Sequence, residues 1–370
     1  MRILYISGAL HQHGGIETYG RELISGLEGR GHAIEIVEAD PESVYKDLSV
    51  RDFWPSRPFR RRYYFWNRVP YEDYRYHVAL GRRVRRAVQS FRPTVVHSLH
   101  LHFFGGVVGS RAPVVVSAYG LDVDPSPPVV GSVLASRVVH AISEFTASLV
   151  RSRLPPGPDV QVLSWGIRPM AARPPRTADF DLITVSRLVR RKNVDTVLRA
   201  IQLVGDLRYA VVGDGPELAA LRELARSLGL RQVSFLGAVS EAERSDLLAR
   251  SRLFVMCPRM EPGDVEGLGL VYFEALGHGL PIVAANNGGV PDAVGTAGLL
   301  VKDSNDPAEL ARAITTALSP ATYDQLKDQV RERARLQTWD AFLARFEALY
   351  AGAADGASAD SPPALSTTRK

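Results

Sequence analysis

Short apolar and β-branched runs recur along the first half of the chain, separated by polar or helical stretches. Most of these runs are continuous rather than alternating, as expected for strands buried on both faces of a parallel sheet. Helical periodicity fills several intervals, including Ile16–Glu28 and Glu72–Gln89. The predicted strands are Ile3–Ser7, Ile34–Ala39, Val95–Leu99, Val114–Ala118, Val138–Ser143 and Val160–Ser164. This alternation predicts a doubly wound α/β domain.

The same pattern starts again after a proline-rich segment. Pro169, Pro174 and Pro175 cannot continue a helix or a central strand, so a linker is predicted there. The strands predicted beyond it are Leu182–Leu188, Tyr209–Gly213, Gln232–Gly237, Leu253–Pro258, Leu280–Asn286 and Gly298–Val301. The helices predicted between and after them are Val194–Gln202, Glu217–Leu228, Glu241–Arg250, Val271–Gly277 and Pro307–Leu318. Two such domains in series predict a ligand site in the cleft between them, beyond the carboxyl ends of the strands.

The C-terminal region differs from both domains. After Leu326 the sequence is charged and helical, and Thr338 is a candidate N-cap for a last helix. The remaining residues are small and polar and include prolines, which predicts disorder. The predicted organisation is a first domain at 1–168, a linker at 169–179, a second domain at 180–335, a last helix at 336–350 and a disordered tail at 351–370.

Composition is consistent with two globular domains, since 370 residues of which 45% are hydrophobic can form two separate cores. Cys257 is the single cysteine, which excludes an internal disulfide. It lies in the apolar run LFVMC, which favours a small core residue over a nucleophile. We find neither the pattern of a signal peptide nor an apolar run of the about 18 residues that a membrane span requires. A cytoplasmic location is therefore expected.

Positive charge is concentrated in one segment, although the whole chain carries a net charge of +5. Residues 57–92 contain many arginines and two acidic residues. Such a patch can face nucleic acid, an anionic membrane or an anionic substrate. It can equally be an ordinary amphipathic helix whose core side carries Val78, Val84 and Val88. We find no nucleic-acid-binding motif and no regular spacing of aromatic residues for base stacking, so no nucleic-acid partner is predicted.

The stretch at 261–292 is the most informative for chemistry. Glu266 and Glu274 flank two glycines, Gly267 and Gly269, at the start of a predicted helix. Glycines at a helix start offer backbone amides to an anion. At helical spacing the two carboxylates lie roughly 80° apart, so they do not form an acid–base pair. The alternative is that both carboxylates are surface residues without a ligand, which the flanking glycines and apolar residues disfavour. Glu274 lies beside an apolar face and needs hydrogen-bond donors there, which ligand hydroxyls would supply.

Three other turns follow predicted strands. Arg187 ends a strand and Lys192 lies near the start of the next helix, so two fixed cations could stabilise the charge of a leaving diphosphate. A solvated basic turn is the alternative, because Arg190 and Arg191 are basic too. The glycine pair Gly14-Gly15 suits a phosphate or an attacking hydroxyl, or is a plain turn. Gly213 marks a further strand-to-helix turn, which either lies at a ligand site on the edge of the cleft or holds no ligand.

Three histidines, His97, His100 and His102, lie at the end of a predicted strand. They make a poor metal site without a neighbouring carboxylate, so no metal is predicted, although His97 is a candidate to face the cleft. The dinucleotide fingerprint G-x-G-x-x-G follows none of the strands, which disfavours a dehydrogenase. No cofactor is predicted.

Taken in order, these motifs resemble those of the family-4 retaining glycosyltransferases, which have the GT-B fold. The segments that carry the resemblance are GGIE, SRLVRRKN, VVGDGPE, EGLGLVYFEALGHGLPIVA and NNGGVPD. The segment DVEGLGLVYFEA is also similar in sequence to bacterial mannosyltransferases acting on phosphatidylinositol-type lipids. The resemblance covers nearly the whole chain and implies two Rossmann-like domains facing each other across a cleft.

The resemblance also implies roles in the second domain. Arg187 and Lys192 would hold the donor diphosphate, Glu274 the ribose hydroxyls, and Glu266 the hydroxyls of the transferred sugar. Backbone amides would line the sugar and phosphates at Gly267, Leu268, Gly269 and Leu270. Gly213 would lie within this nucleotide-sugar site. Members of the family need no metal and retain the anomeric configuration.

In the first domain, the resemblance places Gly14 and Gly15 against the phosphates. Tyr119 stands where the family often has a histidine; its phenol can donate a hydrogen bond to the sugar but is a poor base near neutral pH. Trp165 replaces an asparagine that is common in the family. The last helix, with Trp339, would cross back and pack on the first domain.

The sequence therefore predicts a retaining transferase that moves a hexosyl group from a UDP- or GDP-hexose to a hydroxyl of a glycan, glycolipid or small molecule. The acceptor would attack from the side that the nucleotide leaves, and a diphosphate oxygen would take its proton. Contact with an anionic membrane through 57–92 is a further expectation. The alternatives are a nucleotide-sugar epimerase or hydrolase on the same fold, or a basic nucleic-acid-binding protein.

Overall fold

The computed structural model describes residues 1–11, 14–41, 44, 71–110, 112–169, 178–261 and 263–355. It divides into two compact units. The first comprises Met1–Ile142, Thr146–Leu163 and the chain from Leu343 onward, and the second comprises Ser143–Phe145 and Ser164–Phe342. The basic segment up to residue 70, the linker prolines at 174 and 175, and the predicted tail beyond residue 355 lie outside the described residues.

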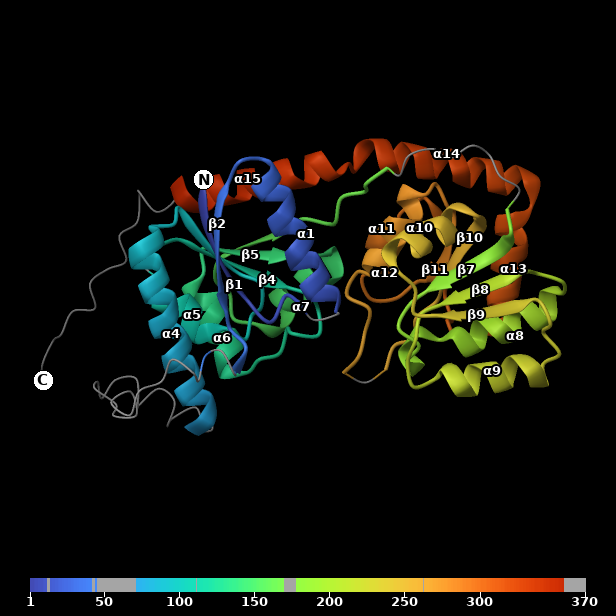
Figure 1. Ribbon diagram of the computed structural model, residues 1–370, viewed down its shortest axis with the longest axis horizontal. Helices are drawn as coiled ribbons and strands as arrows, with labels where there is room; N and C mark the ends of the chain where they lie inside the picture. Colours follow the sequence, from blue (N-terminus) through green and yellow to red (C-terminus); the bar gives the residue numbers. More distant parts are fainter. Residues whose placement is uncertain are drawn as a thin grey trace, which may run out of the picture. The chain divides into compact units, whose positions relative to one another are not determined.

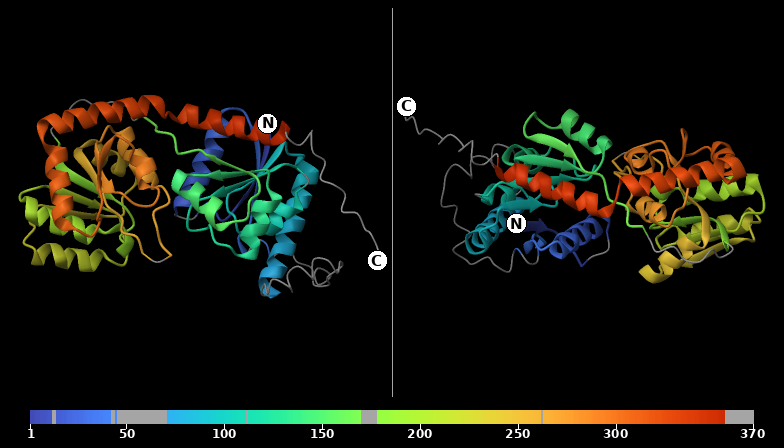
Figure 2. Two further views of the ribbon diagram at one scale, coloured as in Figure 1. Left: turned by 180° about the vertical axis from the view of Figure 1, so that it is seen from behind. Right: turned by 90° about the horizontal axis from the view of Figure 1, so that it is seen from above.

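The first unit is built on a six-stranded parallel sheet of order β2-β1-β3-β4-β5-β6 (Figures 1 and 2). Its strands are β1 (Arg2–Ser7), β2 (Ala33–Glu38), β3 (Val95–Ser98), β4 (Val114–Ala118), β5 (Val138–Ala141) and β6 (Asp159–Val162). Its helices are α1 (Gly15–Gly29), α4 (Tyr71–Phe91), α5 (Phe104–Gly109), α6 (Pro127–Ala135), α7 (Glu144–Arg153) and the part of α15 (Trp339–Asp355) that begins at Leu343. Both faces of this sheet are therefore covered by helices, as its continuous apolar strands predict.

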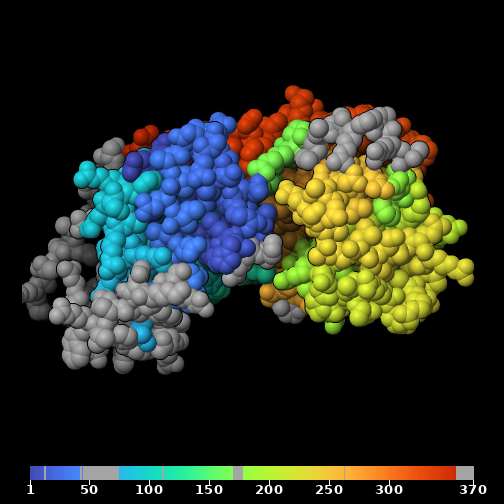
Figure 3. Space-filling view, viewed as in Figure 1, coloured from blue at the N-terminus to red at the C-terminus, as the bar shows by residue number. Residues whose placement is uncertain are grey.

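Alternate residues of each strand face opposite sides of this sheet. Leu4, Ile6 and Val96 belong to a core shared with α4 and α6. Tyr5 and His97 face the other side, where they meet Tyr350 of α15. Figure 1 shows α1 and α4 on opposite sides of the sheet, and Figure 3 shows both helices at the surface of this unit.

A continuous chain of hydrogen bonds crosses the face of the sheet that α15 covers. The Tyr5 and Tyr350 hydroxyls are 2.8 Å apart, and the Tyr350 hydroxyl is 2.7 Å from Nδ1 of His97. Nε2 of His97 is 2.7 Å from Ser117 Oγ, which is 2.8 Å from Nδ1 of His140. Nε2 of His140 lies 3.1 Å from the Leu163 carbonyl oxygen. Since a carbonyl only accepts, His140 donates to it, and every other bond then points from Tyr5 toward His140.

The second unit contains a parallel sheet of order β12-β11-β10-β7-β8-β9. Its strands are β7 (Phe180–Val185), β8 (Tyr209–Val212), β9 (Val233–Gly237), β10 (Ser251–Met256), β11 (Ile282–Ala285) and β12 (Gly298–Val301). Its helices are α8 (Val194–Val204), α9 (Leu218–Ser227), α10 (Glu241–Ala249), α11 (Leu270–Gly277), α12 (Val290–Val294), α13 (Pro307–Leu318) and α14 (Pro320–Leu336).

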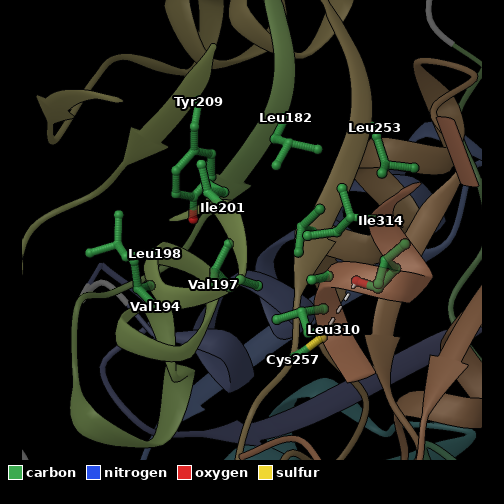
Figure 4. Close-up of a cluster of buried hydrophobic side chains, with 14 of the residues drawn as sticks. Leu182, Val194, Val197, Leu198, Ile201, Tyr209, Leu253, Cys257, Leu310 and Ile314 are labelled. Atoms are coloured by element: carbon green, nitrogen blue, oxygen red, sulfur yellow. Dashed lines mark hydrogen bonds between the residues drawn. The ribbon is translucent and has the colours of Figure 1, made fainter. Parts of the chain in front are cut away.

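The core of this second unit contains Cys257, as the sequence predicts. The side chain is fully buried in a cluster that includes Leu310 and Ile314 of α13 (Figure 4). Its thiol lies 3.8 Å from the Val283 carbonyl oxygen, and burial raises the pKa of the thiol well above its usual range. Cys257 therefore has the packing role of a small apolar residue.

The strands that the sequence predicts are all present, with ends that differ by a few residues. Four short helices, α5, α6, α7 and α12, are not predicted, and α14 begins at Pro320 rather than near Leu326. The last helix continues through Asp355, so the prediction of disorder from residue 351 is wrong for its first five positions. Alanine is the best helix former, and Ala353 is buried there. No helix in the described part of the chain has the length and apolarity of a membrane span.

Candidate functional site

The loops after β7 and β10 meet at the point where the strand order of the second sheet reverses, which is where open α/β sheets bind ligands. The amide of Arg259, after β10, donates to the carbonyl of Arg191, after β7, at 2.9 Å. Asn193 has a left-handed backbone with φ of 60°. Its buried side-chain amide donates through Nδ2 to the carbonyl of Cys257 at 2.9 Å. These bonds fix the basic turn Arg190–Lys192 against the loop that carries Glu266.

Glu266 lies at the centre of this region. Both Nη1 of Arg191 and Nζ of Lys192 lie 2.5 Å from its Oε2. The three side chains are between 11% and 13% exposed, so water screens their charges little. Burial alone would raise the pKa of Glu266, but the charges of Lys192 and Arg191 outweigh it and hold that pKa below its ordinary value. Glu266 is therefore an ionised carboxylate, and no described residue hydrogen-bonds its Oε1.

The structure changes how the basic turn is understood. Arg191 was predicted only as part of a possibly solvated turn, but it is mostly buried against Glu266, with its Nε 2.7 Å from Asp264 Oδ1. Arg190 does match a solvated residue, since its side chain is 74% exposed and pairs with Glu261 at the surface. The sequence does not indicate the roles of Arg191 and Asp264, because Arg191 is about 75 residues away in the chain from the acidic residues that it contacts.

The glycine turn after Glu266 presents backbone amides. Four backbone amides here are predicted to bind the sugar nucleotide, and none of them donates a hydrogen bond to a described residue. They belong to Gly267, Leu268, Gly269 and Leu270. Gly269 has φ of 84° and forms the N-cap of α11. A second glycine pair supports the turn, because the Gly289 amide donates to the Glu266 carbonyl at 2.8 Å and a Cβ on Gly289 would overlap the Gly267 carbonyl. Amides at a helix start suit an anion, and the binding of one here stays a prediction.

Arg187 and Gly213 lie on neighbouring loops of the same sheet edge. The Arg187 side chain is exposed, and none of the described residues pairs with it. Gly213 has φ of 127°, and a Cβ there would overlap the Ser186 carbonyl, so a glycine is required beneath the Arg187 loop. The Gly213 amide already donates to the Gly237 carbonyl at 2.7 Å. Gly213 thus supports the loop of Arg187, and its contact with a ligand stays a prediction.

Glu274 lies on α11 and is not enclosed by apolar residues. Its Oε2 is 2.8 Å from Nε of Arg244 on α10, and both side chains are about one-third exposed. Arg244 thus supplies part of the hydrogen bonding to Glu274 that is predicted to come from ligand hydroxyls. A role for Glu274 at a ribose stays a prediction.

The predicted residues of the first unit are placed at the carboxyl edge of its own sheet. Gly14 has extended backbone and precedes α1, whose first residue is Gly15. Tyr119 follows β4, is 8% exposed, and packs edge-on against Tyr19 with ring centroids 5.5 Å apart. Its hydroxyl has no partner with hydrogen-bond geometry among the described residues, and burial raises the pKa of this phenol well above its usual range. The buried Tyr119 hydroxyl therefore keeps its proton at neutral pH and can donate a hydrogen bond.

Two of the three predicted histidines, His97 and His102, have surroundings other than those predicted. His97 is fully buried in the hydrogen-bond chain described above, so it is a core residue. The prediction that no carboxylate neighbours these histidines is wrong, because Asp124 Oδ2 lies 2.9 Å from Nε2 of His102. Within the described ranges, no group of three or more histidine, cysteine, aspartate or glutamate side chains could hold a metal ion.

Trp165 and Trp339 pack against each other in the second unit, with ring centroids 4.8 Å apart. The part of α15 that packs in the first unit begins at Leu343 and contributes Phe346 and Tyr350. Trp165 therefore has a packing partner that accounts for its large side chain.

Two family models match the chain in succession, "Glycosyltransferase Family 4" over residues 13–170 and "Glycosyl transferases group 1" over residues 170–337. Together they span most of the chain. The chain belongs to the family-4 glycosyltransferases. Solved structures agree on the fold of this family-4 member. Anabaena HepE in complex with UDP has a TM-score of 0.71 at 16% identity, covering 95% of this chain and 100% of that one. Sucrose-phosphate synthase from Thermosynechococcus elongatus has a TM-score of 0.69 at 18% identity, with 95% and 98% covered.

Curated relatives of this family-4 member include two GDP-mannose-dependent alpha-(1-6)-phosphatidylinositol monomannoside mannosyltransferases. The one from Mycolicibacterium smegmatis is 34% identical over 242 residues, 62% of this chain and 61% of the relative. The one from Mycobacterium tuberculosis is 34% identical over 206 residues, 49% of this chain and 54% of the relative. The chain thus spans about half to three-fifths of the length of these relatives. Its fold is GT-B, with two Rossmann-like units.

Proposed function

We propose that this protein is a retaining glycosyltransferase that transfers a hexosyl group from a nucleoside-diphosphate sugar to an acceptor hydroxyl. The observation that carries the proposal is the turn Gly267–Leu270, whose amides meet no acceptor in the described chain and lie directly after the buried Glu266 and its two cations. A diphosphate needs amide donors and fixed positive charge, and a sugar needs a fixed carboxylate. The second unit offers all three on adjacent loops.

Each residue then has a distinct task. Arg187 is exposed and faces no described partner, so it is available to the diphosphate. Lys192 neutralises Glu266 in the free protein and shares its charge with the diphosphate when the donor binds. Glu266 keeps Oε1 for a sugar hydroxyl because both cations occupy Oε2. Fixed cations stabilise the leaving diphosphate, and its oxygen takes the proton of the attacking hydroxyl.

A thermal-shift screen of GDP-, UDP- and ADP-sugars tests the donor. GDP-mannose is the first to examine, because two relatives carry it in their names, whereas HepE was solved with UDP. A true donor at a hundred times its Kd stabilises the protein by about 2.7 kcal/mol through mass action. If none of the nucleotide sugars raises the Tm, the proposed function is wrong.

Product analysis with the donor alone separates transfer from the alternatives on the same fold. An epimerase would convert the sugar while it stays on the nucleotide, and a hydrolase would release it at full rate into water. A transferase leaves most of the donor intact until an acceptor hydroxyl is supplied. Rapid conversion without any acceptor would exclude the proposed reaction.

Contact with an anionic membrane is part of the proposal for the acceptor. The relatives named above act on a phosphatidylinositol glycolipid, and α4 carries exposed arginines at Arg86 and just beyond its end at Arg92. Flotation with phosphatidylinositol-containing vesicles, in low and high salt, tests this contact. Salt-sensitive flotation supports it, and equal binding to neutral vesicles contradicts it. A DNA duplex is the control for unspecific attraction to the basic helix.

A further inference from the structure

A polar cluster outside the donor region lies at the carboxyl edge of the first sheet. It comes from the loops after β3 and β4, next to the strand-order reversal between β1 and β3. Nε2 of His102 is 2.9 Å from Asp124 Oδ2, and Nδ1 of His102 is 3.2 Å from Nδ1 of His100. The side chains of His102 and Asp124 are each 41% exposed, so a ligand can reach them.

The contacts of this cluster fix part of its proton arrangement. Asp124 is fixed by the Ser126 amide, which donates to Oδ1 at 2.8 Å. A carboxylate only accepts, so Nε2 of His102 donates to Asp124. The Nδ1 atoms of His100 and His102 share one proton at 3.2 Å, because two lone pairs cannot face each other. Burial, and next the charge of His102, lowers the pKa of His100 to about 4, so His100 is neutral at pH 7.

No described residue hydrogen-bonds Nε2 of His100, a ring nitrogen that can donate to or accept from a ligand hydroxyl. The cluster ends in this ring nitrogen on one side and in the exposed carboxylate of Asp124 on the other. Each Asp124 oxygen accepts one hydrogen bond from the described residues and can accept a second. Hydroxyl groups, which both donate and accept hydrogen bonds, therefore suit both ends.

Three carboxyl groups lie around the cluster, and one guanidinium, that of Arg153, donates to the Val123 carbonyl at 3.4 Å. Glu17 of α1 and Asp124 both act on His100, and both oppose the lowering of its pKa. Asp122 is 6% exposed, accepts from the Tyr119 amide at 2.7 Å through Oδ1, and has a buried Oδ2 without a partner in the described chain. These carboxyl groups repel a phosphate and favour neutral hydroxyls.

We propose that His100, His102 and Asp124 bind the neutral, polyhydroxylated ring of the acceptor, a sugar or a cyclitol, rather than a phosphate group. The cluster presents a carboxylate fixed by a backbone amide and a ring nitrogen that no described residue hydrogen-bonds, which matches two hydroxyls of one ring. Its part in sugar transfer rests on the function proposed above, whereas the binding of a polyol does not.

Saturation-transfer difference NMR on the full chain tests the site with two probes, methyl α-D-mannopyranoside and myo-inositol. The expected result is a signal for at least one polyol that inorganic phosphate does not displace. His102→Ala should weaken this binding about tenfold or more, since it removes hydrogen bonds linked to a charged group. Asp124→Asn should give a smaller loss in the same direction and serves as a second variant if His102→Ala does not fold.

His32→Ala is the matched control. His32 pairs with Glu347 at 2.7 Å, the same type of contact, but at the amino edge of the same sheet, before β2. It should leave the polyol signals unchanged. Three results would overturn the proposal: no signal for either probe, full retention of the signal in His102→Ala and Asp124→Asn, or displacement by phosphate.

The donor screen keeps this test separate from the proposed function. A protein that gains stability from a nucleotide sugar but binds neither polyol has the function without this acceptor site. A protein that binds polyols at His102 but gains no stability from any nucleotide sugar has the site without the function. Where both hold, His102→Ala should raise the acceptor KM and leave the donor KM unchanged.

Discussion

Replacing Glu266 by glutamine removes the one negative charge that Arg191 and Lys192 share. Because both nitrogens lie 2.5 Å from the same oxygen, they can be no more than about 5 Å apart. In wild-type protein the carboxylate offsets their mutual repulsion. In Glu266→Gln the side chain keeps its size but not its charge, and the two cations stay within a region that is nearly closed to water.

The size of this effect follows from the distance. Two unit charges about 5 Å apart at an effective dielectric constant of about 20 repel each other by about 3 kcal/mol. This agrees with the roughly 3–5 kcal/mol usually lost when one partner of a buried pair is removed. For a unit of this size, 1 kcal/mol corresponds to about 2–4 °C, so the Tm of the second unit should fall by about 6–12 °C.

Differential scanning calorimetry with and without GDP or UDP measures both consequences. The variant should melt earlier, and a saturating nucleoside diphosphate should raise its Tm by more than it raises that of wild type, because the diphosphate replaces the missing negative charge. Glu261→Gln is the matched control, since it removes a surface partner of Arg190, whose side chain is 74% exposed. Such a pair contributes about 0–1 kcal/mol.

The reasoning is refuted if Glu266→Gln melts within the range of Glu261→Gln. It is also refuted if the nucleoside diphosphate stabilises the variant less than wild type, because the two cations would then not form part of an anion site.

Three further predictions concern separate residues. Arg187→Ala should lower kcat by about ten- to a thousandfold through loss of a contact to the leaving diphosphate, measured with the donor that the screen identifies; near-normal turnover would remove this role. Glu274→Ala should weaken the binding of the free nucleoside diphosphate in calorimetry, whereas Glu223→Ala, at an exposed pair, should not. His140 is fully buried and its pKa is lowered, chiefly by burial, to about 4, so protons bind the unfolded state preferentially between pH 6.5 and 4. The free energy of unfolding of the first unit should therefore fall as the pH drops through this range, by about 3 kcal/mol from this group. Urea unfolding at a series of pH values measures this free energy, and it should depend less steeply on pH in His140→Asn than in wild type. An identical pH dependence in both proteins would contradict the low pKa of His140.

Sequence reasoning succeeded where a residue's environment depends on its immediate neighbours. Strands such as β4 are buried on both faces, so their continuous apolar runs identify them. Helix α5 was missed because its sequence, FGGVVG, is short and rich in glycine and valine, and only packing against α4 makes it helical. The helical turn at Ala351–Asp355 was missed because small residues were taken as a sign of disorder.

The candidate site was predicted in part for the same reason. Glu266, Lys192 and the glycine turn occur in contiguous motifs, so their types and spacing carry information. Their contacts are tertiary: nothing in the local sequence indicates that Lys192 meets Glu266, or that Arg191 is buried while Arg190 is exposed. Likewise, Asp124 lies in a different loop from His102, and only the pairing of β3 with β4 brings the two together.

The hydrogen-bond chain from Tyr5 to His140 has a consequence for the order in which the protein folds during synthesis. The strands of the first sheet are complete once Val162 has emerged from the ribosome, yet Tyr350, the link between Tyr5 and His97, is made about 190 residues later. At translation rates of about 5–20 residues per second, this interval lasts roughly 10–40 s. Throughout it His97 and Tyr5 lack their native partner, while the strands and most of the helices of the second unit are being synthesised. The N-terminal unit of this protein is thus the last to be completed, and a chain released between Phe342 and Tyr350 lacks a part of its first unit although its second unit is whole.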